Sequence, residues 1–139
     1  MTKEIAWIES EPEFTLPYQI EICQNPKVKL LQYKEAKEAL NALNAKKFDL
    51  IVLNPRLNPG EDYPKVVDFN LDYDYSRIGL DLIVRRGTQN LNVPLILILG
   101  YLTKELQKQF LEQGVSEMVN TNTPTKEFYG IVKKYLNQE

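Results

Sequence analysis

Five short apolar segments recur along the chain and predict the strands of a sheet. They are residues 5–8, 28–31, 50–53, 95–99 and, more weakly, 118–119. The third and fourth segments are almost unbroken apolar runs, a pattern typical of strands that helices cover on both faces. We therefore expect a parallel sheet whose central strands are fully buried.

Four amphipathic patterns lie between or after these segments and predict helices. Their apolar positions are Ala36, Ala39, Leu40 and Leu43; Leu80, Ile83 and Val84; Leu102, Leu106 and Phe110; and Phe128, Ile131, Val132, Tyr135 and Leu136. Thr103 is a suitable N-cap for the third pattern, and Gly87 and Gly114 can end the second and third. Both glycines fall where a helix would give way to a strand.

The segment between the first two strands fits two structures. Tyr18, Ile20 and Ile22 alternate as in a strand, whereas Leu16, Ile20 and Cys23 have helical spacing. We favour the helix, because strands that alternate with helices imply right-handed crossovers. The predicted fold is then α/β: a doubly wound three-layer sandwich with a five-stranded parallel sheet.

Residues 60–77 interrupt this alternation, and we expect a long loop insertion there within a single domain spanning residues 1–139. A connection of this length in a compact domain is commonly functional, although it can also be a solvated loop. It combines aromatic with acidic side chains, a composition typical of interfaces that would favour a basic partner. The predicted partner surface comprises Tyr63, Asp68, Phe69, Asp72, Tyr73, Asp74 and Tyr75, together with Tyr101 after the fourth strand.

Charge and residue types exclude several classes of function. The formal net charge is −2, and the lysines and arginines are scattered, which argues against nucleic acid as a partner. The chain has no histidine and one cysteine, so zinc sites and Ser/His or Cys/His catalysis are disfavoured. We expect no enzyme activity, cofactor or metal. Trp7 and Cys23 are expected in the core.

We expect no targeting segment in this chain. No apolar run approaches the roughly 20 residues that a membrane helix needs. The start, Met-Thr-Lys-Glu, lacks the apolar stretch of a secretory signal, and a lone Cys23 cannot form an internal disulfide. We therefore expect a cytoplasmic protein that does not insert into membranes.

Five local motifs in this order resemble the receiver domain of two-component response regulators. They are residues 8–13 (Ile-Glu-Ser-Glu-Pro-Glu), 48–54 (Phe-Asp-Leu-Ile-Val-Leu-Asn), 79–82 (Gly-Leu-Asp-Leu), 93–98 (Val-Pro-Leu-Ile-Leu-Ile) and 114–119 (Gly-Val-Ser-Glu-Met-Val). The resemblance covers nearly the whole chain outside the insertion. It implies the flavodoxin-like strand order 2-1-3-4-5.

The resemblance also indicates a degenerate phosphorylation site. Receiver domains hold Mg²⁺ with acids after the first strand and phosphorylate an aspartate after the third. Here Glu9 is followed by Ser10, and Asn54 stands at the acceptor position, where an amide cannot form an acyl phosphate. Leu99 falls at the hydroxyl position of the family, and Thr121 falls at its phosphate-binding lysine.

We therefore predict a phosphorylation-independent pseudo-receiver that acts as a signalling or scaffold module through protein contact. The alternative is a flavodoxin-like protein or enzyme that binds a nucleotide or small ligand at the carboxyl ends of the strands. Glu11 and Pro12 make the first loop acidic and rigid, which opposes phosphate binding there. A homodimer formed through the last helix and its neighbouring strand is a third possibility. Glu9 and Glu11 are better explained as loop acids than as metal ligands.

Overall fold

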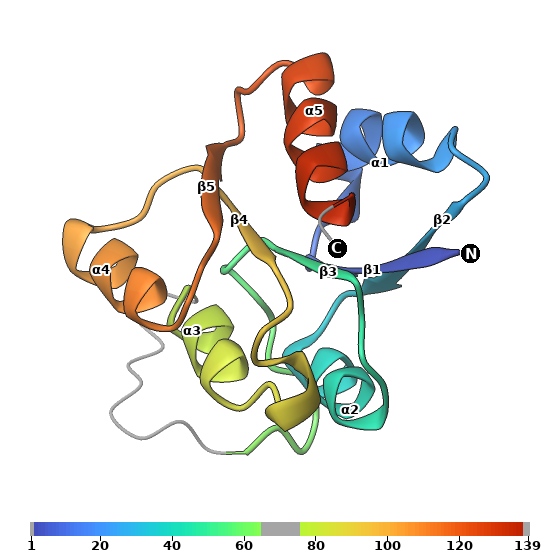
Figure 1. Cartoon of the computed structure of the whole chain (residues 1–139). Coiled ribbons are helices and arrows are strands. Elements are labelled where there is room, and N and C mark those ends of the chain that lie inside the picture. Colours follow the sequence, from blue (N-terminus) through green and yellow to red (C-terminus); the bar gives the residue numbers. More distant parts are fainter. Residues whose placement is uncertain (1, 65–75, 138–139) are drawn as a thin grey trace.

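The computed structural model describes residues 2–64 and 76–137 and contains one five-stranded sheet. The strands are β1 (Lys3–Ile8), β2 (Val28–Tyr33), β3 (Leu50–Leu53), β4 (Leu95–Leu99) and β5 (Glu117–Asn120). Every pair of neighbours is parallel, and the order is β2-β1-β3-β4-β5 (Figure 1). The predicted fold class and strand order are both confirmed.

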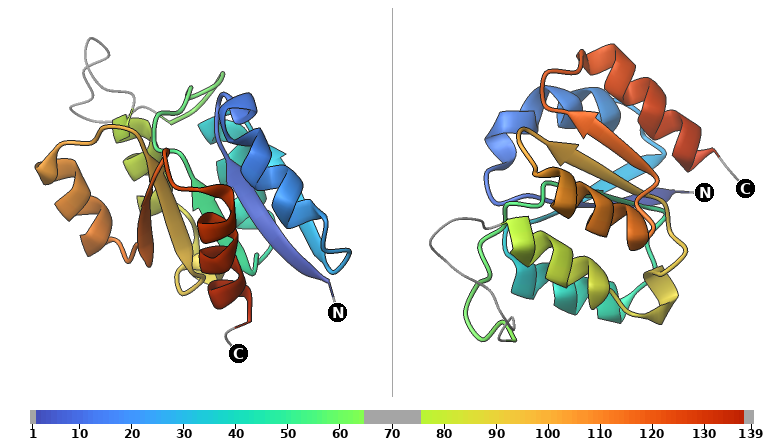
Figure 2. Two further views of the ribbon diagram at one scale, coloured as in Figure 1. Left: turned by 90° about the horizontal axis from the view of Figure 1, so that it is seen from above. Right: turned by 90° about the vertical axis from the view of Figure 1, so that its left-hand side faces the viewer.

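Helices cover both faces of the sheet and form the two outer layers. They are α1 (Leu16–Cys23), α2 (Ala36–Ala45), α3 (Ser76–Val84), α4 (Lys104–Glu112) and α5 (Thr125–Leu136), with short 3-10 turns η1 (Pro12–Thr15) and η2 (Thr88–Asn90). The right-hand view of Figure 2 shows α1 and α5 on one face and α2, α3 and α4 on the other. Among the described residues, no helix has the length and apolar character needed to cross a membrane.

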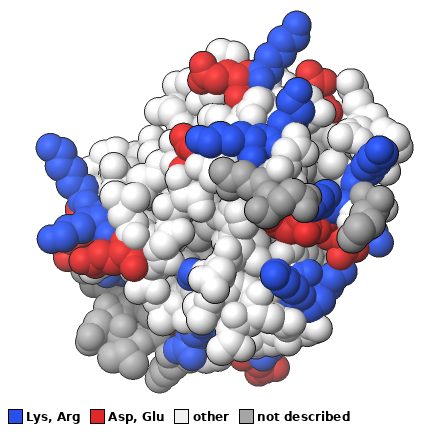
Figure 3. Space-filling view, in the orientation of Figure 1, with Lys and Arg blue, Asp and Glu red and all other residues white. Residues whose placement is uncertain are grey.

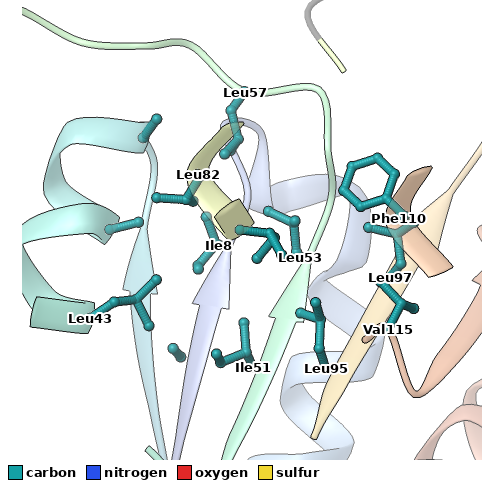
Figure 4. Close-up of a cluster of buried hydrophobic side chains, with 14 of the residues drawn as sticks. Ile8, Leu43, Ile51, Leu53, Leu57, Leu82, Leu95, Leu97, Phe110 and Val115 are labelled. Atoms are coloured by element: carbon teal, nitrogen blue, oxygen red, sulfur yellow. The ribbon is translucent and has the colours of Figure 1, made fainter. Parts of the chain in front are cut away.

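Side chains of β1 alternate between the two faces of the sheet, as the strand period requires. Ile5 and Trp7 pack with α1 and α5, whereas Ala6 and Ile8 pack with α2, α3 and α4. All four are buried, and each large side chain contributes about 1.5–3 kcal/mol through burial. Figure 4 shows the cluster that contains Ile8, in which Leu43 of α2, Leu82 of α3 and Phe110 of α4 pack against the strands.

The segment with the ambiguous pattern is helix α1, but the buried face differs from the prediction. Tyr18 and Ile22, which are four residues apart, are buried, whereas Leu16, Ile20 and Cys23 are exposed. The Tyr18 ring stacks on Phe128 of α5, with ring centroids 4.3 Å apart, and this contact fixes which side of α1 faces inward. The expectation that Cys23 lies in the core is therefore wrong, while that for Trp7 is correct.

The boundary of helix α3 also corrects the sequence analysis. Ser76 and Arg77, which were assigned to the insertion, form the first residues of α3. Val84, expected on the buried stripe of this helix, is 56% exposed, because Ile78, Leu82 and Ile83 supply the inward face. Residues 65–75 of the predicted insertion lie outside the described residues.

The start of α3 lies very close to the loop that follows β3. The Gly79 N–H donates to the Pro55 carbonyl over 3.1 Å. A Cβ atom at position 79 would lie 2.5 Å from the Cα and carbonyl oxygen of Pro55, so only glycine allows this approach without a backbone shift. The start of α3 is therefore hydrogen-bonded directly to the loop by which the chain leaves β3.

The predicted ends of α4 are confirmed. The Thr103 hydroxyl caps α4 by accepting a hydrogen bond from the Leu106 N–H (3.2 Å), which satisfies a donor that the first turn leaves free. Gly87 and Gly114 follow α3 and α4 with φ values of +84° and +91°. Positive φ favours glycine at both positions. Gly114 lies between α4 and β5, whereas Gly87 lies three residues after α3 ends at Val84 and leads into turn η2 before β4.

A buried arginine crosslinks the connecting segments at the amino edge of the sheet. The side chain of Arg86, only 4% exposed, follows α3 and donates to four backbone carbonyls. They belong to Ile83 (2.8 Å), Asn90 (3.3 Å), Leu91 (3.1 Å) and Gln113 (2.9 Å). Burial lowers the pKa of the guanidinium from its usual value. The interactions tie the end of α4 to the connection between α3 and β4.

Asn90 holds the neighbouring part of the same edge. Its side chain is fully buried and bonds three backbone groups. The Oδ1 atom accepts from the Phe48 N–H (3.0 Å), and Nδ2 donates to the carbonyls of Leu43 (2.7 Å) and Lys46 (2.9 Å). These partners lie at the end of α2 and before β3, so Asn90 joins the approach to β3 to the approach to β4.

Candidate functional site

All five residues of the predicted degenerate site lie at the carboxyl edge of the sheet. Glu9 and Ser10 follow β1, Asn54 follows β3, Leu99 ends β4, and Thr121 follows β5. Because the carboxyl ends of parallel strands share one edge, residues distant in sequence meet there. All five line a single cavity of about 840 Å³.

Glu9 forms the buried floor of this cavity and is only 3% exposed. Its Oε1 atom accepts hydrogen bonds from the Thr15 hydroxyl and from Trp7 Nε1 (3.3 Å), and Oε2 accepts from Asn54 Nδ2 (3.1 Å). Burial raises the pKa of the Glu9 carboxyl, although the three hydrogen bonds lower it, and the nearby Glu13 raises it further. Within the described part of the chain, no lysine or arginine forms an ion pair with Glu9.

The amide of Asn54 is fixed by contacts at both of its ends. Nδ2 donates to Glu9, and Oδ1 accepts from the Arg56 N–H over 3.3 Å. The Asn54 N–H donates to the Ile8 carbonyl (2.9 Å), which holds the residue against the end of β1. An aspartate at position 54 would place a second carboxylate against Glu9 without an intervening donor, and like charges at that distance repel strongly.

Ser10 connects two loops instead of supplying a second acid. Its hydroxyl donates to the Lys34 carbonyl (2.7 Å) and accepts from the Asn58 N–H (2.8 Å). An ionised carboxylate could not donate to that carbonyl. The serine at this position therefore holds together the loops that follow β2 and β3.

The far side of the cavity has no charged group at the positions where receiver domains contact a phosphoryl group. Leu99 is half-buried and apolar, and Thr121 is exposed. The Thr121 N–H donates to the Leu99 carbonyl (3.1 Å), which keeps the two strand ends together. Among the described lining residues, Arg56 is the one cation, and Glu9 and Glu11 are the acids.

The contacts of Glu9 include two residues whose role the sequence analysis missed. Trp7 was expected in the core, where it lies, but its indole N–H also points at Glu9. The spacing gave a signal, since residues two apart in a strand face the same side. Thr15 gave no such signal, because its approach to Glu9 depends on the geometry of turn η1. Within that turn, the Thr15 hydroxyl also contacts the Pro12 carbonyl.

The predicted partner surface is placed only in part. The Tyr63 hydroxyl donates to Asp81 Oδ2 (2.6 Å), which also accepts from Arg85 Nε (2.7 Å). Burial, followed by the contact with Asp81, raises the pKa of Tyr63 above its usual range. Tyr63 thus packs on α3 and is not among the residues that line the cavity, whereas Tyr101 lines the cavity and is 82% exposed. Outside the described residues lie Asp68, Phe69, Asp72, Tyr73, Asp74 and Tyr75.

Groups that could hold a metal are sparse. Over residues 2–64 and 76–137, no three His, Cys, Asp or Glu side chains gather closely enough to ligate an ion. The cavity itself offers the carboxylates of Glu9 and Glu11, and the oxygens of Glu9 are already engaged by three donors.

The fold is similar to solved receiver domains over nearly the whole chain. The non-phosphorylated HemR receiver domain from Leptospira biflexa matches with a TM-score of 0.74 and 19% identity, covering 99% of this chain and 97% of that one. A signal receiver domain of a histidine kinase from Clostridium thermocellum gives 0.75 and 15%, covering 99% and 100%. A CheY-like receiver domain protein from Methanospirillum hungatei gives 0.74 and 15%, covering 99% and 95%.

The similarity to receiver domains is found by comparing structures and not by comparing sequences. No protein-family model matches the chain, and no curated protein matches it. At 15–19% identity the similarity establishes the architecture, which agrees with the strand order and the position of the cavity. The chain therefore has the fold of a response-regulator receiver domain.

Proposed function

We propose that this chain is a phosphorylation-independent receiver-like module that acts in signalling by binding a protein partner. The observation that carries the proposal is the amide of Asn54, which stands at the end of β3 and donates to the buried carboxylate of Glu9. In a receiver fold this position carries the phosphoryl acceptor. Here it carries a neutral group that is already engaged on both sides.

Three further features oppose phosphoryl transfer. The amide oxygen of Asn54 is a poor nucleophile compared with a carboxylate. Pro55 has no backbone N–H, so the succinimide route that would convert Asn54 to aspartate is blocked. Thr121 supplies no cation to neutralise phosphoryl oxygens, and transfer depends on such neutralisation.

Contact with a protein is favoured over catalysis by the residues around the cavity. Its described lining contains no cysteine or lysine, and the chain has no histidine, so three residue types that often act as nucleophile or general base are absent from that lining. Phe14 and Tyr101 line it and are 74% and 82% exposed. Exposed aromatic side chains are common anchors in protein interfaces. On the face in Figure 3, lysines and arginines are interspersed with acidic and uncharged residues, which does not favour nucleic acid.

The proposal is tested by intact-mass measurement after incubation with acetyl phosphate and Mg²⁺. We expect no phosphoryl adduct, and we expect the backbone amide spectrum to be unchanged by beryllofluoride. A conventional receiver domain treated in parallel provides the positive control. A mass gain of one phosphoryl group that hydroxylamine removes would overturn the proposal.

The Asn54→Asp variant sharpens this test. We expect it to remain unphosphorylated, because it still lacks a second acid at position 10 and a cation at position 121. We also expect it to be less stable than the wild type by about 1–2 kcal/mol at neutral pH, because the introduced carboxylate and Glu9 would repel each other without a bound cation. Urea unfolding measures the difference, and stability equal to that of the wild type would contradict this account of the pair.

A second function is supported by the size of the cavity. Its volume of about 840 Å³ is within the range of pockets that bind small molecules. A nucleotide or flavin bound there would be retained by the purified protein and would be visible in its absorbance spectrum and native mass. We expect neither, since Glu9 and Glu11 disfavour phosphate groups.

A further inference from the structure

We infer that the cavity accepts a lysine or arginine side chain presented by the partner protein, with its cationic end directed at Glu9. This inference rests on the proposed function and names the chemistry of the partner at that same site. Three observations support it. The buried residue at the cavity floor, Glu9, is acidic, and the exposed aromatic residues Phe14 and Tyr101 line the same cavity. These residues also disfavour other classes of ligand.

The floor of the cavity carries a buried carboxylate that has no counter-charge among the described residues. The three donors to Glu9, from Trp7, Thr15 and Asn54, are all neutral, and no described lysine or arginine forms an ion pair with it. Burying an unpaired charge is unfavourable. The Oε2 atom accepts one of these hydrogen bonds and retains capacity for another. An ammonium or guanidinium group there would form a charge-assisted hydrogen bond.

The walls of the cavity suit the aliphatic stem that precedes such a cation. Phe14 comes from turn η1, and Tyr101 comes from the loop between β4 and α4. Both line the cavity while most of their surface faces solvent. Lysine and arginine stems pack on apolar surfaces, and their charged ends are attracted to aromatic faces. Two exposed aromatic side chains thus flank the approach to one buried carboxylate.

Other ligand classes fit these residues less well. An anion would meet Glu9 and Glu11, with Arg56 as the one cation of the described lining to oppose them. A neutral ligand would leave the charge of Glu9 uncompensated. A divalent ion would compete with the three donors that already engage the oxygens of Glu9, and among the described residues no three His, Cys, Asp or Glu side chains gather to hold one.

The test uses capped tripeptides as probes and the ¹H–¹⁵N spectrum of the full chain as the readout. The probes are acetyl-Gly-Lys-Gly-amide, acetyl-Gly-Arg-Gly-amide and the same peptide with citrulline, a neutral counterpart of arginine. The indole N–H of Trp7, the one tryptophan of the chain, and the side-chain amide of Asn54 both donate to Glu9, so their signals report directly on its carboxylate. We expect both signals to shift with the Lys and Arg peptides, with dissociation constants on the order of 1 mM, and to be unaffected by the citrulline peptide.

Three variants locate the interaction. Glu9→Gln is expected to weaken binding of the cationic peptides about tenfold or more, as removal of a buried charge partner does. Glu105→Gln makes the same change in net charge on an exposed residue of α4 that does not line the cavity, and it is expected to leave binding within about twofold. Should Glu9→Gln fail to fold, Arg56→Ala remains: Arg56 is exposed, and removing its charge is expected to strengthen binding about twofold to fivefold.

Several results would overturn the inference. These are equal binding of the citrulline peptide, unchanged binding by folded Glu9→Gln, or unchanged or weaker binding by Arg56→Ala. Spermidine binding more tightly than the lysine peptide would identify a free amine as the ligand instead of a partner side chain. Phosphoryl uptake would defeat the proposed function whatever the peptides do. If the peptides fail to bind while the chain stays unphosphorylated and still captures a partner, the inference alone fails.

Discussion

The two edges of the sheet use buried polar side chains in opposite ways. At the amino edge, Arg86 and Asn90 bond seven backbone groups between them, and their partners are parts of the same framework. At the carboxyl edge, Glu9 and Asn54 bond mainly to other side chains and face an open cavity. The amino edge thus holds the connections of the fold in place, while the carboxyl edge keeps polar groups beside a space that a ligand can enter.

The buried arginine gives the largest expected effect in this comparison. Arg86→Met removes the guanidinium donors from four carbonyls, and we expect a loss of about 3 kcal/mol or more in the free energy of unfolding. Arg85→Met is the matched control next to it in sequence. Arg85 is exposed and pairs with Asp81 four residues earlier, so its loss is expected to cost below about 1 kcal/mol. Similar losses for both variants in urea unfolding would contradict this distinction.

Two asparagines test the same contrast with a smaller change. Asn90→Ala removes three hydrogen bonds to buried backbone groups and should cost about 2–3 kcal/mol. Asn54→Ala removes one donor from Glu9 and one acceptor from the Arg56 N–H at a half-buried site, and should cost about 1 kcal/mol. Thermal and urea unfolding of the two variants measure the difference. If Asn54→Ala were the more damaging change, the carboxyl edge would be part of the framework after all.

The smallest expected effect is the pH dependence that Glu9 adds to stability. Its pKa in the folded chain is raised above the usual 4.5, mainly by burial. Between 4.5 and that raised value the folded state binds more protons than the unfolded state, so this group makes the fold less stable as the pH rises through the window. Glu9→Gln does not titrate. The stability of the wild type minus that of the variant should therefore increase as the pH is lowered from 7 towards 4.5.

Urea unfolding of both proteins at several pH values measures this difference, and the subtraction removes contributions from other carboxyl groups. Glu105→Gln, which makes the same change on an exposed side chain, is measured in parallel as the control. A difference that stays constant from pH 7 to 4.5, or that declines on acidification, would show that burial does not dominate the environment of Glu9.

The α/β fold could be predicted from the sequence because the pattern of apolar residues identifies most strands and helices, and their order along the chain limits how they can be arranged. Unbroken runs such as residues 95–99 identified central strands, and the carboxyl ends of parallel strands had to share one edge. That rule agrees with the resemblance to receiver domains, which placed Glu9 and Asn54 in one site. The face of α1 was not accessible, since Leu16, Ile20 and Cys23 form as good a helical stripe as Tyr18 and Ile22, and the aromatic contact with α5 decides between them.

The polar contacts of the site were less accessible for a different reason. Arg86 looks like a solvated charge in any sequence pattern, because arginine is rarely buried and its four carbonyl partners carry no sequence signal. Thr15 reaches Glu9 through a turn whose path is not encoded by periodicity. The sequence therefore located the cavity but not the donors that fix its buried carboxylate.

The hydrogen bond from Gly79 to Pro55 has a consequence for variation in chain length. The two residues are held together by the sheet edge and by α3, so the intervening chain starts and finishes at points that the framework already fixes. For any flexible connection between two fixed ends, the entropy of closure grows only with the logarithm of its length, and doubling the length costs about 0.6 kcal/mol. Residues added between Tyr63 and Ser76 should thus be tolerated well, which makes this connection a suitable place to splice in a fluorescent or affinity tag while leaving the cavity intact.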